Sequence, residues 1–288
     1  MCSAVRPAKD FFLSGSALGY NKRWEMRPDT FISTIYQSLY SRTLYRDVAL
    51  KWKGIGLAYL ILLLSLHWIP EIMKVQREVA ERLDSEAPHY ISQVPLITIT
   101  KGKAFIKEKS PYYIYEPDNK TVFAVIDISG GYALTDNSTT IGLLTETRLI
   151  AKNNITGYSS IDLSQVDKLV VDRKLLYEWL DEFKDIFAYM MYPFALFFSF
   201  IFHVFQVLIG AFIGRLFCRM NNIGLDFRAL MRLSAVVCTP PVLLQTAHTL
   251  LGATFFFAGP ISFIIMLGFL YYAVQACVSK ETGVNKFV

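Results

Sequence analysis

Three long stretches without a charged residue constrain this chain more than any other feature of its sequence. Residues 54–70, 186–214 and 233–279 contain no Asp, Glu, Lys or Arg. A charge at the centre of a lipid-exposed helix costs about 2.5–3.5 kcal/mol on insertion scales, so such stretches are typical of segments that cross a bilayer. The sequence therefore predicts a multi-pass membrane protein.

The lengths of these stretches predict four transmembrane helices, since one crossing needs about 20 mainly apolar residues. The second stretch is long for one crossing and is expected to tilt. The third stretch is divided by Gly252, Gly259 and Pro260, so it is expected to hold two helices. The predicted helices cover residues 54–73, 186–214, 233–251 and 258–279.

The distribution of charge predicts the orientation of these helices. Residues 1–53 carry nine basic and four acidic residues, and the loop 215–232 carries four arginines against one aspartate. The insert 74–185 has 14 basic and 17 acidic residues. Because Lys and Arg are enriched on the cytoplasmic side, both termini are expected in the cytoplasm and the insert outside it. The net charge of +5 thus indicates topology, and no pattern typical of a nucleic-acid groove is present.

The segment before the first span is expected to form an amphipathic helix over residues 28–53. Phe31, Ile35 and Leu39 recur at a spacing of four, which gives one apolar face. This helix would lie at the membrane surface or would pack beneath the bundle, and the sequence leaves both alternatives open. The rest of the cytoplasmic side is expected to be a loosely ordered extension over 1–27, the basic loop 215–232 and a tail over 280–288.

The insert 74–185 is expected to be an α+β domain. Helical patterns cover residues 71–85 and continue from Leu169 toward the second span. Between them, short alternating runs are separated by turn signals such as Lys101-Gly102. These runs predict about five strands in a mostly antiparallel sheet, over 96–100, 103–107, 112–116, 121–127 and 148–152. The predicted fold class is a helical bundle of four transmembrane helices with an inserted extracytoplasmic α+β domain.

The sequence carries no pattern typical of a cofactor site or an active site. Its cysteines, Cys2, Cys218, Cys238 and Cys277, lie outside the insert and form no Cys-x-x-Cys pair. Zinc-protease, nucleophile-elbow, phosphate-loop and dinucleotide motifs are absent. We therefore expect no cofactor, no bound metal and no enzymatic activity.

Two stretches resemble an uncharacterised family of bacterial multi-pass membrane proteins, some of whose members are labelled maltodextrin-utilisation membrane proteins. The first stretch runs from Phe31 to Arg46 and on to Trp52. The second combines residues 94–103 with Val-Ile-Asp at 125–127 and Arg-Leu-Ile-Ala at 148–151. The resemblance covers about residues 28–280 and implies a location in the bacterial cytoplasmic membrane. It implies no reaction.

Three polar side chains within the predicted spans are candidates for a shared site. His67, His203 and Gln245 lie 14, 12 and 13 residues from Lys53, Arg215 and Arg232 respectively. At ~1.5 Å per helical residue each lies roughly 18–21 Å from its basic neighbour, so the three could share one level. A proton relay or a small polar ligand could use such a cluster. The alternative, which we favour, is that each makes one interhelical hydrogen bond.

Two short motifs are expected to shape the helices. Pro240 and Pro241 remove two backbone donors and are expected to kink or break the third span, as in transporters with broken helices, although a structural kink is the simpler explanation. Gly210 and Gly214 have the spacing that lets helices approach closely, within the chain or in a homo-oligomer.

Charged groups outside the spans give weaker candidates. The arginines of the basic loop could contact anionic lipid headgroups, namely Arg215, Arg219, Arg228 and Arg232. Asp127 ends a predicted strand and could bind a cation, although an aspartate there more often forms a turn.

Taken together, these patterns favour a non-enzymatic protein of the bacterial cytoplasmic membrane. The insert would bind a protein or an envelope ligand, as an adaptor, sensor or assembly factor. The alternative is a transport component in which the kinked third helix and the polar span residues line a path. The expected partners are membrane lipids and another membrane or envelope protein, with self-association left open and nucleic acid excluded.

Overall fold

The computed structural model describes residues 28–132, 140–153, 157–252 and 258–277, so the predicted extension 1–27 and tail 280–288 lie outside the described residues. The chain divides into two compact units. Unit 1 comprises Met1–Leu60, Gln206–Pro240 and Phe263–Val288, and unit 2 comprises Ile61–Phe205 and Pro241–Ser262. Each unit is described by itself below.

Four helical segments of the described residues are long and apolar enough to cross a membrane, which agrees with the predicted number. They are α3 (Leu57–Gln93), α4 (Arg173–Met220), α5 (Phe227–Val237) followed by α6 (Thr239–Leu250), and α7 (Ala258–Ala276). The first two extend well beyond the predicted spans 54–73 and 186–214, since α3 continues to Gln93 and α4 begins at Arg173. The helical pattern expected over 71–85 is therefore part of α3, which runs through both Pro70 and Pro88.

Unit 1 contains α1 (Pro28–Gln37) and α2 (Arg42–Leu50) in place of the single helix expected over 28–53. The helix is interrupted because Ser41 caps a new one: its hydroxyl accepts from the Leu44 N–H at 3.3 Å. Tyr45 and Val48 of α2 are both 0% exposed. One face of α2 is therefore packed within unit 1, and the position of this helix relative to a membrane stays a prediction.

The α+β domain in unit 2 contains two sheets, where one was expected. The first has the order β2-β1-β8, and the second has the order β3-β4-β5-β6-β7. Neighbouring strands are antiparallel except β4 and β5, which are parallel. The first sheet is built from β1 (Ile97–Thr100), β2 (Lys103–Ile106) and β8 (Lys168–Val171). The second is built from β3 (Tyr112–Tyr115), β4 (Val122–Asp127), β5 (Gly142–Thr145), β6 (Arg148–Asn153) and β7 (Gly157–Asp162).

The strand predictions were correct where a turn signal stood beside an alternating run. Lys101 and Gly102 both have positive φ, at 51° and 77°, and form the predicted turn between β1 and β2. This is the turn geometry that matches the twist of a hairpin.

The helix expected from Leu169 onward was wrong at its beginning. Residues 168–171 form β8, in which Val170 and Val171 pair with Thr98 and Ile97 of β1. β-branched residues suit a pleated surface, and the free edge of β1 provides the partner. The preceding segment, Leu163–Gln165, forms a short 3₁₀ turn capped by Asp162.

Candidate functional site

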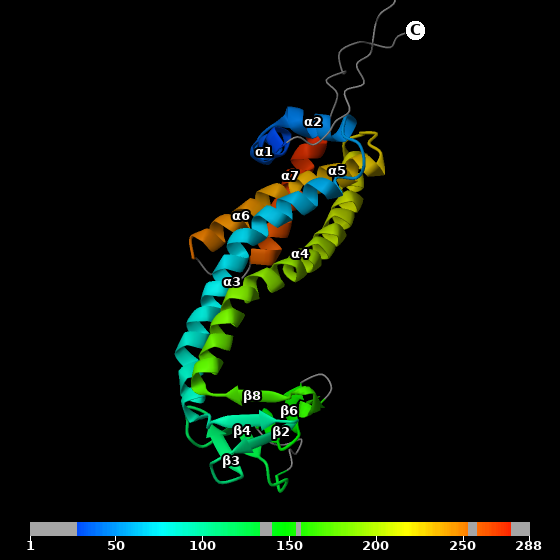
Figure 1. The fold of residues 1–288 in the computed structure, drawn as a ribbon. Coiled ribbons are helices and arrows are strands. Elements are labelled where there is room, and N and C mark those ends of the chain that lie inside the picture. The colour runs from blue at the N-terminus through cyan, green and yellow to red at the C-terminus, as the bar shows by residue number, and fades with distance from the viewer. Residues whose placement is uncertain (1–27, 133–139, 154–156, 253–257, 278–288) are drawn as a thin grey trace, which may run out of the picture. The chain divides into compact units, whose positions relative to one another are not determined.

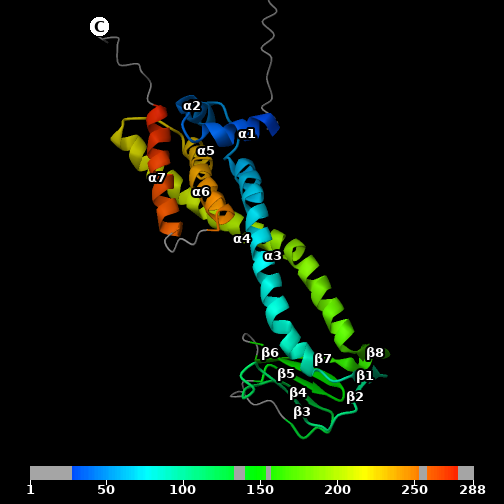
Figure 2. The same ribbon diagram turned by 90° about the vertical axis from the view of Figure 1, so that its left-hand side faces the viewer.

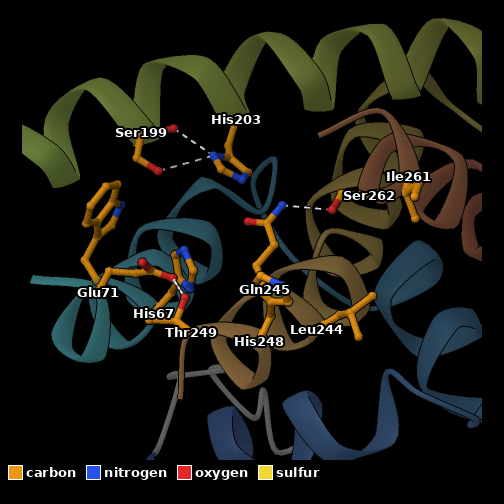
Figure 3. A pocket seen from close by; sticks show the side chains of 11 residues that line it. His67, Glu71, Ser199, His203, Leu244, Gln245, His248, Thr249, Ile261 and Ser262 are labelled. Carbon is orange, nitrogen blue, oxygen red and sulfur yellow. Dashed lines mark hydrogen bonds between the residues drawn. The ribbon is translucent and has the colours of Figure 1, made fainter. Parts of the chain in front are cut away.

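A cavity of about 530 Å³ lies within unit 2, between α3, α4, α6 and the start of α7. His67 of α3, His203 of α4 and Gln245 of α6 all line it. Figure 3 shows these side chains converging from three helices on the same space. The structure thus brings together the three polar residues that the sequence placed at one level.

Each helix presents a pair of polar residues to the cavity at a spacing of four. The pairs are His67 with Glu71 on α3, Ser199 with His203 on α4, and Gln245 with Thr249 on α6. Residues four apart lie on the same face of a helix, so one polar face per helix suffices to build the site. Sequence reasoning missed Glu71, Ser199 and Thr249, although this spacing from the three identified residues could have found them.

Hydrogen bonds hold the imidazoles of His67 and His203. Nδ1 of His67 lies 2.7 Å from Oγ1 of Thr246, whose own hydroxyl donates to the Val242 carbonyl at 2.9 Å. Nδ1 of His203 lies 2.8 Å from the Ser199 carbonyl oxygen. Both rings are therefore fixed at Nδ1, which determines how each presents Nε2.

Two further pairs of polar groups form hydrogen bonds within the cavity. The Gln245 amide donates to Oγ of Ser262 at 2.9 Å, and the Thr249 hydroxyl donates to the Glu71 carboxylate. No group of three His, Cys, Asp or Glu side chains in the described residues could hold a metal ion. The arrangement is a hydrogen-bonding cavity with one carboxylate and three imidazoles, those of His67, His203 and His248, bordered by the apolar side chains of Leu244 and Ile261.

The two glycines predicted to allow close helix packing do so inside the chain. A Cβ on Gly210 would lie 2.5 Å from Met266 Cε and 3.0 Å from Ser234 Oγ. A Cβ on Gly214 would lie 3.3 Å from Leu230 Cδ2. Both glycines are buried against α5 and α7 within unit 1, so this face is already covered by the chain itself.

The helix break expected at Pro240 and Pro241 lies just before them. α5 ends at Val237 and α6 begins at Thr239, so both prolines occupy the first turn of α6. In a first turn the backbone N–H has no intrahelical partner, and its loss in proline is tolerated there.

The four arginines expected to contact lipid headgroups differ in their surroundings. Arg215, Arg219 and Arg228 are exposed, and for them lipid contact stays a prediction. Arg232 instead donates to the backbone carbonyls of Val48, Ala49 and Gly54 at 3.0, 2.6 and 3.0 Å. The structure therefore gives Arg232 a different role, which is to hold the end of α2 against α5.

A family model described as a protein of unknown function, DUF1189, matches residues 32–274 of the chain. The chain belongs to the DUF1189 family. This agrees with the resemblance to an uncharacterised family and does not extend to the maltodextrin label. Neither a curated protein nor a solved structure matches the chain.

The matched DUF1189 region includes the junction at which α3 joins the α+β domain. The Gln93 side chain bonds the backbone of Tyr115 on β3, accepting from its N–H at 2.8 Å and donating to its carbonyl at 2.9 Å. The Tyr112 hydroxyl donates to the Gln93 carbonyl at 2.9 Å. The ring centroids of Tyr90 and Phe123 lie 4.2 Å apart. The end of α3 is thus fixed to the second sheet by both backbone and side-chain contacts.

The beginning of α4 in this DUF1189 protein is fixed to the same domain. Asp172, directly after β8, accepts from the Leu175 N–H at 2.8 Å and so caps the helix. Leu176 packs against the buried cluster of the domain, which includes Ile97, Ile99 and Val171. Because β1 and β8 are hydrogen-bonded neighbours, α3 and α4 are joined to adjacent strands of one sheet.

Asp127, considered above as a cation ligand, organises a turn instead. It is buried, and it accepts from the Ser110 hydroxyl, the Ser129 N–H and hydroxyl, and the Tyr132 N–H, at 2.8, 2.9, 2.5 and 2.6 Å. Burial raises its pKa, but these hydrogen bonds outweigh that effect and hold the pKa well below its usual range.

Proposed function

We propose that this DUF1189 protein is a multi-pass protein of the bacterial cytoplasmic membrane, with both termini in the cytoplasm and residues 74–185 outside. Its role is non-enzymatic: the outer α+β domain binds a protein or an envelope ligand, and the helices anchor the domain and respond to its state. The number of long apolar helices and the basic residues of the 1–53 and 215–232 segments support this arrangement.

One observation carries the proposal: α3 and α4 run without a break from the cavity to the domain. Along this path the Tyr192 hydroxyl donates to the Ser65 carbonyl at 2.9 Å, and the Gln76 amide donates to the Lys184 carbonyl at 3.3 Å. Lys184 also pairs with Asp84 at 2.7 Å. Figure 2 shows the two helices side by side down to the sheets. A domain that merely covered the membrane surface would need no such pair of continuous helices joined by hydrogen bonds and an ion pair.

This construction links binding outside to a response of the helices. Gln93 and Leu176 fix both helices to the domain, so a ligand that shifts the two sheets relative to each other would also move α3 against α4. A ligand changes such an equilibrium only by the difference in its affinity for the two states. We therefore expect the partner to contact the sheets rather than the exposed sides of α3 and α4.

The test is capture of a partner by the full chain in its own membranes, with photo-crosslinkers at exposed positions. Phe105 and Ile161 are 49% and 61% exposed on β2 and β7, whereas Met73 is 56% exposed on α3. The proposal predicts one defined adduct from a domain position, and its loss in the Phe105→Glu or Ile161→Glu chain. No adduct from either domain position, or the same adducts from Met73, would contradict it.

A second candidate function, a transport component, is favoured by the polar cavity between the apolar helices. Transport predicts that His203→Leu and Gln245→Leu abolish flux, while Ile161→Glu on the domain leaves flux unchanged. The recognition proposal predicts the opposite pattern for partner capture: loss with Ile161→Glu and retention with the two cavity variants. The two functions are therefore separated by the same three variants.

A further inference from the structure

Two of the three imidazoles that line the cavity, those of His67 and His203, present hydrogen-bond acceptors, and this follows from their partners. The Thr246 hydroxyl hydrogen is used by the Val242 carbonyl, so the His67 Nδ1 must donate to Thr246. The Ser199 carbonyl can only accept, so the His203 Nδ1 also donates. A neutral imidazole that donates through Nδ1 keeps a lone pair on Nε2. Both histidines therefore offer Nε2 as an acceptor.

Gln245 and Glu71 also present acceptors to the cavity. The Gln245 amide nitrogen donates to Ser262, which leaves the amide oxygen as its acceptor. The Glu71 carboxylate accepts from Thr249 and has further acceptor capacity. Among the described residues that line this cavity, none is Lys or Arg. The indole N–H of Trp68 is a donor without a hydrogen-bond partner in the described residues, but it has almost no accessible surface and is not offered to a ligand.

We propose that this cavity binds a small organic ammonium ion with an apolar body. Four acceptors, one of them a carboxylate, are complementary to the three donors and the positive charge of a primary ammonium group. The aromatic ring of Trp68 in the lining adds a surface that attracts cations, and Leu244 and Ile261 border the space left for an apolar body.

The geometry favours an organic cation over a metal ion. The described residues bring no three His, Cys, Asp or Glu side chains together as metal ligands, as noted above. A cavity of about 530 Å³ also falls in the range typical of small-molecule sites and far exceeds the space of a bare ion. The inference goes beyond the proposed function, because it assigns a ligand class to a site separate from the outer domain.

The experiment uses the full chain in nanodiscs and calorimetric titration with n-butylammonium and 2-phenylethylammonium. The neutral alcohols of the same carbon skeletons are the matched ligands, and empty nanodiscs correct for partition into lipid. We expect at least one amine to bind at least tenfold more tightly than its alcohol. Equal binding of amine and alcohol, or no saturable binding of either amine, overturns the proposal.

Two cavity variants and one control complete the test. Glu71→Gln removes the carboxylate charge and is expected to weaken amine binding at least tenfold, with little effect on the alcohol. Glu78→Gln, an exposed carboxylate on the same helix, should leave binding unchanged. If Glu71→Gln fails to fold, His203→Leu removes one acceptor and is expected to weaken amine binding at least threefold. Unchanged amine affinity in a folded cavity variant overturns the proposal.

Discussion

Replacing Arg232 gives the sharpest test of the packing of unit 1. The last carbonyls of a helix have no partner within it. In α2 the Lys51 N–H donates to the Asp47 carbonyl. The Arg232 guanidinium donates to the carbonyls of Val48 and Ala49, and also to the Gly54 carbonyl beyond the helix. One side chain of α5 therefore holds the end of α2 and the chain that follows it.

The cost of Arg232→Ala follows from these three bonds. A hydrogen bond to a charged group contributes about 1.5–3 kcal/mol when it is shielded from water. The bonds to Val48 and Ala49 are partly buried and the bond to Gly54 is exposed. Counting the two partly buried bonds at the low end and the exposed bond as negligible gives a loss of about 3 kcal/mol in the free energy of unfolding. Arg232→Lys keeps one bond at most and should lose about half of this.

The assay is thermal unfolding of the full chain in nanodiscs, followed by its helical circular dichroism. A loss of about 3 kcal/mol corresponds to a fall of roughly 6–12 °C in the melting temperature. Arg228→Ala, an exposed arginine of the same helix, is the matched control and should change stability by less than about 0.5 kcal/mol. The reasoning is refuted if Arg232→Ala and Arg228→Ala melt at the same temperature.

Three further predictions concern other parts of the fold. Gly210→Leu should destabilise unit 1 by about 2–4 kcal/mol in denaturant titrations, because even a Cβ at this position would collide with Met266. As a control, Gly268→Ala should stabilise the protein by about 0.5–1 kcal/mol, because nothing lies within 4 Å of a Cβ at that position. Thr239→Val should lower the free energy of unfolding more than Tyr59→Phe in the same titrations. In Thr239→Val the Tyr59 hydroxyl loses its buried acceptor, 2.7 Å away, whereas in Tyr59→Phe the Thr239 hydroxyl still donates to the Val236 carbonyl. Asp127 has a lowered pKa when folded, so its contribution to stability is complete above its unfolded pKa of about 3.9 and is lost as pH falls toward the folded value. Asp127→Asn should therefore destabilise the α+β domain at pH 7 and reduce the loss of stability between pH 5 and pH 3; an unchanged pH profile would contradict this.

How much of the fold was predictable depended on whether the signal was local. Uncharged stretches are set by composition, so the number of apolar helices was correct, and the Lys101-Gly102 hairpin was correct because turn and strands are neighbours in sequence. β8 was missed because its strand state depends on pairing with β1, about 70 residues earlier, which no local pattern records. The lengths of α3 and α4 were missed because a charge ends a predicted span but does not end a helix.

The candidate site divides in the same way. His67, His203 and Gln245 were identified because polar residues are rare within apolar stretches, and the helical rise placed them at one level. Glu71 lies just beyond the uncharged run that ends at Pro70, so a search for polar residues within the uncharged runs missed it, although it lies one turn from His67. Arg232 was misjudged for a different reason: positive charge near a span end indicates sidedness, while its actual partners are carbonyls about 180 residues away in the chain.

The most direct test of the account is the position of the α+β domain relative to the membrane. A phosphatase reporter that is active only outside the cytoplasm, fused after Gly130 in the domain, should be active, and the same reporter fused after Asn222 in the basic loop should be inactive. A fluorescent reporter that folds only in the cytoplasm should show the reverse pattern, with no fluorescence after Gly130 and fluorescence after Asn222. An inactive phosphatase after Gly130 would place the domain inside the cell and contradict the proposed recognition of an envelope ligand.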